Sequence, residues 1–199
     1  MTGKILRVDL SNQAHTVEEP DEKIYRTYFG GSCLACYYLL KERPAGINPL
    51  DPENLLIFAS SPLVGSGIPG ANRFSVASLS PLTGYYGEAE AGGWWSPELK
   101  RAGYDAILVE GKAEKPVYLW IHDGILDIND ADDLWGKDTW TATDHIRCEM
   151  GDDVIQVLGI GKDHCGVLPP KFQGHLLQVA VRRVLQEETP HIRRPRKRE

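Results

Sequence analysis

The chain of 199 residues contains no run of eighteen apolar residues, which argues against a membrane-spanning helix. Its first twelve residues, MTGKILRVDLSN, lack the apolar centre of a signal peptide, so we expect a cytoplasmic protein. The six histidines are scattered, no H-E-x-x-H pattern occurs, and no nucleophile lies beside a base in a local motif. We therefore predict that the chain supplies no catalytic residue of its own.

Only four cysteines are present, too few and too irregularly spaced for the disulfide framework of a secreted protein. Cys33 and Cys36 form a C-x-x-C pair, whereas Cys148 and Cys165 are isolated. Such a pair occurs in metal and redox sites, but a second pair at ligand spacing is missing and the surrounding pattern is helical. The alternative, which we favour, is that both are small residues facing a helix surface.

Basic residues are scarce over most of the chain. Residues 1–161 hold 13 Lys and Arg against 24 Asp and Glu, whereas residues 162–199 hold 9 against 4. An acidic body argues against nucleic-acid binding, which requires a basic face. The basic end, HIRRPRKRE, has the composition of a nucleic-acid or membrane-surface arm, but such ends are usually solvated. We expect neither a nucleic acid nor a membrane as partner.

Apolar periodicity predicts more strands than helices, without regular alternation of the two. The fold class that we predict is therefore α+β, rich in sheet and with a few short helices. Helices are expected at Ser32–Glu42, Ser96–Ala102 and Thr139–Met150. A hairpin is expected from ILRVDL and HTVEE, followed by strands at Leu55–Ala59, Arg73–Leu79, Ala106–Glu110, Val117–His122, Ile125–Ile128 and Val154–Gly159.

The segment from Pro81 to Lys112 contains the pattern most typical of a binding site. A glycine pair, Gly92 and Gly93, precedes a helix in which Ser96 is expected as N-cap and Pro97 as first residue, with Gly103 ending it. Free backbone N–H groups at such a junction suit a phosphate, and the alternative is a tight turn under a core helix. Trp94 and Trp95 come next; aromatic residues beside a glycine pair are more often in the core, and the alternative is that one ring lines a pocket while the other packs in the core.

Several longer motifs extend this pattern over residues 1–161. In chain order they are GKILRVDLS, YFGG, DPENLLIFASSPLVGSG, NRFSVASLSPLTG, AGYDAI and VEGKAEKPVYL. Together they resemble the amino-terminal domain of the aldehyde:ferredoxin oxidoreductases, the tungsten-pterin enzyme family. The resemblance implies the fold of that pterin-binding domain for residues 1–161.

The resemblance ends near Lys162. Family members would continue with a glycine-rich loop for a second pterin and with four cysteines for a four-iron four-sulfur cluster, and neither is found here. Residues 162–199 form a divergent basic tail, in which only Gly174–Leu185 fits an amphipathic helix. A disordered tail would indicate truncation, whereas a tail packed on the sheet would indicate an evolved short protein. Our hypothesis for this departure is a truncated gene product whose reading frame shifts near codon 162.

The resemblance also implies the site residues. Arg73, which the sequence places between a Gly-rich loop and a strand, falls on the arginine that contacts the pterin, and its guanidinium can fork onto phosphate oxygens. Gly92 falls on a glycine whose backbone contacts the pterin, and Ala91 and Gly93 flank it. Glu90 occupies the place of an asparagine whose main-chain carbonyl binds a magnesium ion bridging the phosphates of two pterins. The implied cofactors are a tungsten or molybdenum bis-pterin, this Mg²⁺, and the iron–sulfur cluster whose ligands are absent here.

The function implied is oxidation of aldehydes to carboxylic acids, with electrons passing through the iron–sulfur cluster to ferredoxin. This chain would supply only the base on which the pterin lies. The alternative is a non-catalytic remnant or a module that binds pterin or a partner. Apolar surface that the family's later domains would cover further favours self-association or a partner chain.

Overall fold

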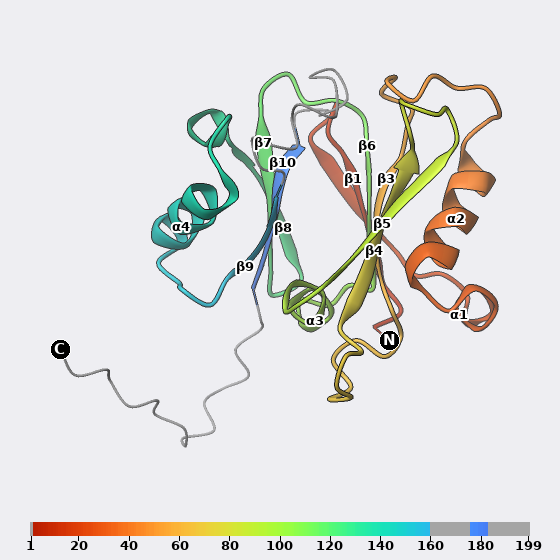
Figure 1. Ribbon diagram of the computed structural model, residues 1–199, viewed down its shortest axis with the longest axis horizontal. Coiled ribbons are helices and arrows are strands. Elements are labelled where there is room, and N and C mark those ends of the chain that lie inside the picture. The colour runs from red at the N-terminus through yellow and green to blue at the C-terminus, as the bar shows by residue number, and fades with distance from the viewer. Residues whose placement is uncertain (1, 160–175, 183–199) are drawn as a thin grey trace.

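The computed structural model of the protein describes residues 2–159 and 176–182. Two β-sheets pack face to face, and helices cover both outer faces (Figure 1). The helices α1 (Glu22–Tyr28) and α2 (Gly31–Glu42) lie on one sheet, and α4 (Thr139–Met150) lies on the other. This layered arrangement confirms the predicted α+β class. No helix in the described ranges is long and apolar enough to cross a membrane.

The first sheet has the strand order β2-β1-β6-β3-β4-β5, so β5 forms one of its edges. The predicted hairpin is confirmed, because β1 and β2 pair antiparallel. β6 pairs parallel with β1, whereas β3, β4 and β5 continue the sheet antiparallel. The strands are β1 (Ile5–Asp9), β2 (Ala14–Glu18), β3 (Leu56–Ser60), β4 (Arg73–Leu79), β5 (Tyr86–Gly92) and β6 (Ala106–Glu110).

The second sheet has the order β8-β7-β10-β9. Its strands are β7 (Val117–His122), β8 (Ile125–Asp130), β9 (Gln156–Gly159) and β10 (Leu176–Arg182), and a short 3₁₀ helix, Asp132–Leu134, follows β8. The helix expected at Gly174–Leu185 is wrong over β10. The backbone there fills the place between β7 and β9, where ladder hydrogen bonds satisfy its polar groups on both sides. The rest of the tail predicted from residue 162 lies outside the described residues.

Alternating side chains of the strands divide the core into layers. On β4, Phe74 faces the second sheet, whereas Ala77 packs beneath α2. On β7, Leu119 faces the first sheet, whereas Tyr118 packs beneath α4. The central strands of each sheet therefore bury side chains on both faces, and the position of α2 relative to β4 is fixed by apolar contact.

A group of polar side chains also fastens α2 to the first sheet. The Arg7 guanidinium of β1 donates to Glu42 near the end of α2, and its Nε donates to Glu18 of β2 at 2.7 Å. The hydroxyl of Tyr38 in α2 donates to the same Glu18 at 2.9 Å. Although burial of Arg7 opposes its charge, these carboxylates raise the net pKa of the guanidinium, so it stays charged.

Helix α3 (Trp95–Arg101) differs from its prediction at the first turn. Its N-cap is Trp94, and Ser96 lies inside the helix, fully buried, with a hydroxyl that has no hydrogen-bond partner among the described residues. The prediction of Ser96 as N-cap is therefore wrong. The ring centres of Trp95 and Phe74 lie 4.8 Å apart. Because of this core contact the helix starts at Trp95, earlier than the Ser96 N-cap would have placed it. At the other end Gly103 (φ 106°) terminates the helix as predicted.

Candidate anion site at the sheet edge

Arg73 lies at one end of the β4–β5 strand pair, next to the edge of the first sheet. It is the first residue of β4 and pairs with Gly92, the last residue of β5. A Cβ placed on Gly92 would lie 3.7 Å from Cδ and 3.8 Å from Nε of Arg73, so the arginine stem runs beside bare backbone. Arg73 is exposed. Within the part of the chain that the structure describes, its guanidinium has no hydrogen bond or ion pair, which leaves all its donors available to an anion.

The loop before β4 is held so that it delivers Arg73 to this position. Lys100 Nζ lies 3.4 Å from the carbonyl oxygen of Pro62 and 3.4 Å from the buried carboxylate of Asp105. Asn72 accepts a hydrogen bond from the Gly65 amide at 3.2 Å, which folds the loop upon itself. The Gly-rich loop before β4, which the sequence predicts to be irregular, is therefore held in place and positions Arg73.

The alternation of β4 places the Arg73 side chain on the same face of the sheet as Ala77, which is the α2 face. Phe74 points to the opposite face, where Trp95 begins α3. The two parts of the predicted anion site thus lie on different faces. α3 is also only seven residues long, so its dipole is small, and anion binding here depends on Arg73 and the glycine backbone rather than on the helix.

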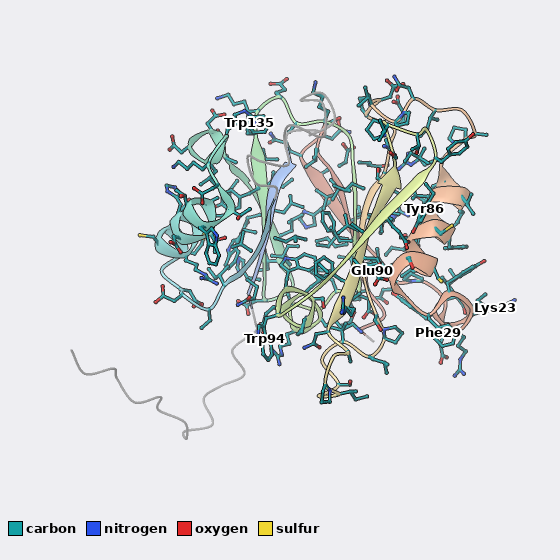
Figure 2. The ribbon with its side chains drawn as sticks, viewed as in Figure 1. Lys23, Phe29, Tyr86, Glu90, Trp94 and Trp135 are labelled. Atoms are coloured by element: carbon teal, nitrogen blue, oxygen red, sulfur yellow. The ribbon has the colours of Figure 1, made fainter. Side chains whose placement is uncertain are left out.

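The other predicted site residues follow along β5, an exposed strand that sequence reasoning did not predict. Glu90 is exposed (Figure 2), and its pairing with Ser75 puts it on the α2 face, the face of Arg73. Ala91 pairs with Phe74 and packs toward the core between the sheets, so its side chain does not face the site. A Cβ placed on Gly93 (φ 113°) would have no atom within 4 Å, so this position is open. Because β5 is an edge, alternate backbone groups point outward, as a main-chain metal ligand would require.

Two carboxylates share the face with Arg73. Glu88 accepts a hydrogen bond from the Tyr86 hydroxyl at 2.7 Å, and that hydroxyl also lies 3.2 Å from the carbonyl oxygen of Ser32 in α2. Partial burial, followed by the bond to Glu88, raises the pKa of Tyr86, so the phenol stays protonated and bridges β5 to α2. Glu90 makes no such bond in the described residues, and its charge opposes an anion unless a cation lies between them.

The turn between α1 and α2 is a feature of the same region that sequence reasoning recorded only as a family motif. Phe29 (φ 59°, ψ −62°) is 67% exposed, and the Gly30 amide donates to the Tyr28 carbonyl at 2.7 Å across it, which makes a strained γ-turn. Gly30 fits against β3, since a Cβ there would lie 2.5 Å from the carbonyl oxygen of Ser60. A Cβ on Gly31 would lie 3.3 Å from Oγ of Ser75. The glycines therefore permit α2 to start close to the strands that carry Arg73.

We expect Gly30→Ala to lower the free energy of unfolding by about 2–4 kcal/mol, because the added methyl group overlaps a backbone oxygen that cannot move away cheaply. Urea denaturation measures this change. The matched control is Gly65→Ala, where φ is also positive (79°) but no atom lies within 4 Å, and we expect a cost of about 1 kcal/mol there. Equal costs for the two variants would show that the Gly30 contact is not tight.

The two adjacent tryptophans have opposite environments. Trp95 is 4% exposed and packs between Phe58 and Phe74, with ring centres 5.9 Å and 4.8 Å away. Trp94 is 63% exposed at the start of α3 (Figure 2). The prediction that one ring packs in the core is confirmed for Trp95, and contact of Trp94 with a ligand stays a prediction.

The chemistry of the Arg73 corner, comprising Arg73, Glu90, Gly92 and Gly93, fits a phosphate-bearing cofactor. A free guanidinium supplies a forked pair of donors, and bare glycine backbone permits close approach. In residues 2–159, no group of three or more His, Cys, Asp or Glu side chains is arranged to hold a metal ion. The corner is therefore suited to hold a phosphate or a similar anion.

Comparisons with known proteins extend over nearly all of the described chain. Residues 5–163 match the family model described as aldehyde ferredoxin oxidoreductase, N-terminal domain. The tungsten-containing aldehyde ferredoxin oxidoreductase of Pyrococcus furiosus is 46% identical over 159 residues, which is 80% of this chain and 26% of the relative. The aliphatic sulfonate oxidoreductase, WOR-like subunit, of the same organism is 39% identical over 67% of this chain and 22% of its own.

A solved structure agrees with these sequences. The active-site complex BamBC of benzoyl coenzyme A reductase, in complex with 1,5-dienoyl-CoA, superposes with a TM-score of 0.86 and 33% identity, over 92% of this chain and 31% of that one. The chain thus spans about a quarter of the length of the aldehyde-oxidising relatives that it matches.

Proposed function

Since the chain belongs to the aldehyde ferredoxin oxidoreductase family as its N-terminal domain, we propose that residues 1–161 form the pterin-binding base of a tungsten oxidoreductase. The reaction proposed is oxidation of an aldehyde to a carboxylic acid, with electrons leaving through an iron–sulfur cluster to ferredoxin. The tungsten-pterin cofactor belongs to the family. Its binding by this chain, the cluster and ferredoxin as partner are parts of the proposal.

The observation that carries the proposal is the guanidinium of Arg73, which lies beside Gly92 and has no partner among residues 2–159 and 176–182. Glu90 lies on the same face two residues from Gly92, yet it forms no ion pair with Arg73. Held beside bare backbone without such a pair, the guanidinium is available to two phosphate oxygens. This is the arrangement that a cofactor with a terminal phosphate would use.

The residues of the Arg73 corner have distinct proposed roles. Arg73 binds the pterin phosphate, and the backbone of Gly92 and Gly93 lets the cofactor lie close to the sheet. The main-chain carbonyl of Glu90 is a proposed ligand of Mg²⁺, whose positive charge would offset that of the Glu90 carboxylate next to the phosphate. When bound, the tungsten pterin supplies the redox chemistry, while this chain anchors and orients it.

The substrate is set outside this domain in our proposal. Relatives that share the domain are named for aldehydes, for an aliphatic sulfonate and for glyceraldehyde-3-phosphate, and the solved structure is of a reductase bound to a dienoyl-CoA. A domain common to such different reactants serves the cofactor and not the choice of reactant. Reduction of an acyl group carried on coenzyme A, which the name of that reductase suggests, is the second candidate reaction.

Elemental and pterin analysis of the chain, isolated without oxygen from a host that makes tungsten and molybdenum pterins, tests the proposal. Tungsten or molybdenum in stoichiometric amount, together with pterin, supports it and also identifies the metal. Protein free of metal and pterin would instead favour a non-catalytic module. Measurement of size in solution, on the same sample, reports whether the chain associates with a second copy or with a partner chain.

A further inference from the structure

The paired cysteines of α2 take no part in the proposed function. Cys33 is exposed and Cys36 is half-buried, and both sulfur atoms are free thiols. They lie together in a groove of about 500 Å³ on the outer side of α1 and α2. The groove is lined by Tyr28, Cys33, Cys36, Tyr37, Leu40 and Lys41.

Helix geometry favours a metal ion over a disulfide between these thiols. Cys33 and Cys36 are the third and sixth residues of α2, three positions apart, so they lie on one side of the helix with Cβ atoms about 5–6 Å apart. A disulfide requires about 3.5–4.5 Å between Cβ atoms, which would distort the helix. An ion placed between the two sulfurs bridges the longer gap without distortion.

The groove around the thiols suits a soft ion bound as an anionic complex. The stacked rings of Tyr28 and Tyr37, with centres 4.4 Å apart, and Leu40 form an apolar wall. Two thiolates with a monovalent ion carry one net negative charge. Lys41, whose Nζ lies 5.5 Å from the Tyr37 ring centre, lines the same groove, and Cys33 lies in the first turn of α2, where the helix dipole favours negative charge.

We propose that Cys33 and Cys36 bind one Cu⁺ ion in two-coordinate, bis-thiolate form. Soft thiolates select Cu⁺, whereas structural Zn²⁺ takes four ligands. In the described ranges 2–159 and 176–182, no third His, Cys, Asp or Glu joins the two cysteines to make a larger ligand set. Binding breaks two S–H bonds, releases both protons to solvent and forms two Cu–S bonds, and no electron is transferred.

An anaerobic titration of the whole chain with Cu⁺, in competition with the chromophoric chelator bathocuproine disulfonate, tests this proposal. We expect one tightly bound Cu⁺ in a Cys148→Ser, Cys165→Ser background, which removes the two isolated thiols. Adding Cys33→Ser or Cys36→Ser is expected to weaken binding about 10²–10⁴-fold, because joining two ligands on one helix gives an advantage of that size.

Circular dichroism separates loss of the site from loss of the fold, and the near-isosteric Ser replacements at an exposed and a half-buried position should leave the helix content unchanged. Lys115→Ala is expected to bind Cu⁺ normally, because Lys115 is exposed just before β7 of the second sheet and belongs to neither site. The proposal is overturned if folded Cys33→Ser and Cys36→Ser variants bind Cu⁺ as tightly as the background protein, or if the background protein binds none.

Discussion

Replacing Arg73 by alanine is expected to lower cofactor affinity about 10–100-fold, because a forked, charge-assisted pair of hydrogen bonds to phosphate is lost. The amounts of tungsten and pterin per mole of chain, measured after gel filtration of the variant and the wild type in the same buffer, report this loss. Arg73→Lys should give an intermediate result, because an ammonium group retains the charge but cannot form two parallel hydrogen bonds. The fold should be unaffected, since the Arg73 side chain is exposed and makes no hydrogen bond or ion pair with the described residues.

The matched control for charge is Lys115→Ala. Lys115 is 70% exposed and lies just before β7 of the second sheet, where it pairs with Asp132 at 3.8 Å. Its loss removes the same single positive charge but no donor from the Arg73 corner, so cofactor content should stay at the wild-type level. If Arg73→Ala and Lys115→Ala retain equal amounts of cofactor, Arg73 does not hold the phosphate.

Trp95→Ala is expected to lower the free energy of unfolding by about 3–5 kcal/mol, the usual cost of removing a large aromatic side chain from a packed core. Trp95 is 4% exposed and contacts the rings of Phe58 and Phe74, so its removal leaves a cavity between the sheets and the start of α3. Urea denaturation followed by far-ultraviolet circular dichroism measures the change.

The adjacent residue provides the control. Trp94 is 63% exposed, and Trp94→Ala should change stability by no more than about 0.5 kcal/mol. The two variants remove the same side chain one residue apart, so composition and unfolded-state effects nearly cancel. Similar losses from both would contradict the placement of Trp95 in the core and of Trp94 at the surface.

The parts of the fold that apolar periodicity determines were predictable. The strands Ala106–Glu110 and Val117–His122, and the helix Thr139–Met150 with Gly151 after it, are confirmed at both ends. In each, burial of one or both faces requires a regular apolar pattern, and Asp138 and Gly151 close α4 by ordinary capping. In these three elements, the local sequence preferences and the packing in the fold favour the same structure.

The elements that were missed lack such a pattern. β5, YGEAEAG, has small and charged side chains because it is a sheet edge, and its strand form depends on pairing with β4. α1 has seven residues and one buried side chain, Tyr25, which is too few for a periodic signal. The early start of α3 depends on contact of Trp95 with Phe74, which are far apart in the sequence.

The candidate site was predictable in its residues but not in its geometry. Arg73, Glu90 and Gly92 could be named from the sequence and its family resemblance, and the structure brings them together at one end of β4 and β5. That Ala91 faces the core follows from strand alternation, which could not be applied while β5 was unrecognised. The strained turn at Phe29 arises from a positive φ, which could not be predicted because phenylalanine rarely adopts it.

Whether the Arg73 corner holds the phosphate of a metal-pterin cofactor is tested most directly by a crystal structure of the cofactor-loaded chain. Anomalous scattering locates the metal in such a crystal. We expect a cofactor phosphate within hydrogen-bonding distance of the Arg73 guanidinium and the pterin lying against Gly92 and Gly93. A cofactor bound elsewhere, with Arg73 facing only solvent, would contradict this assignment.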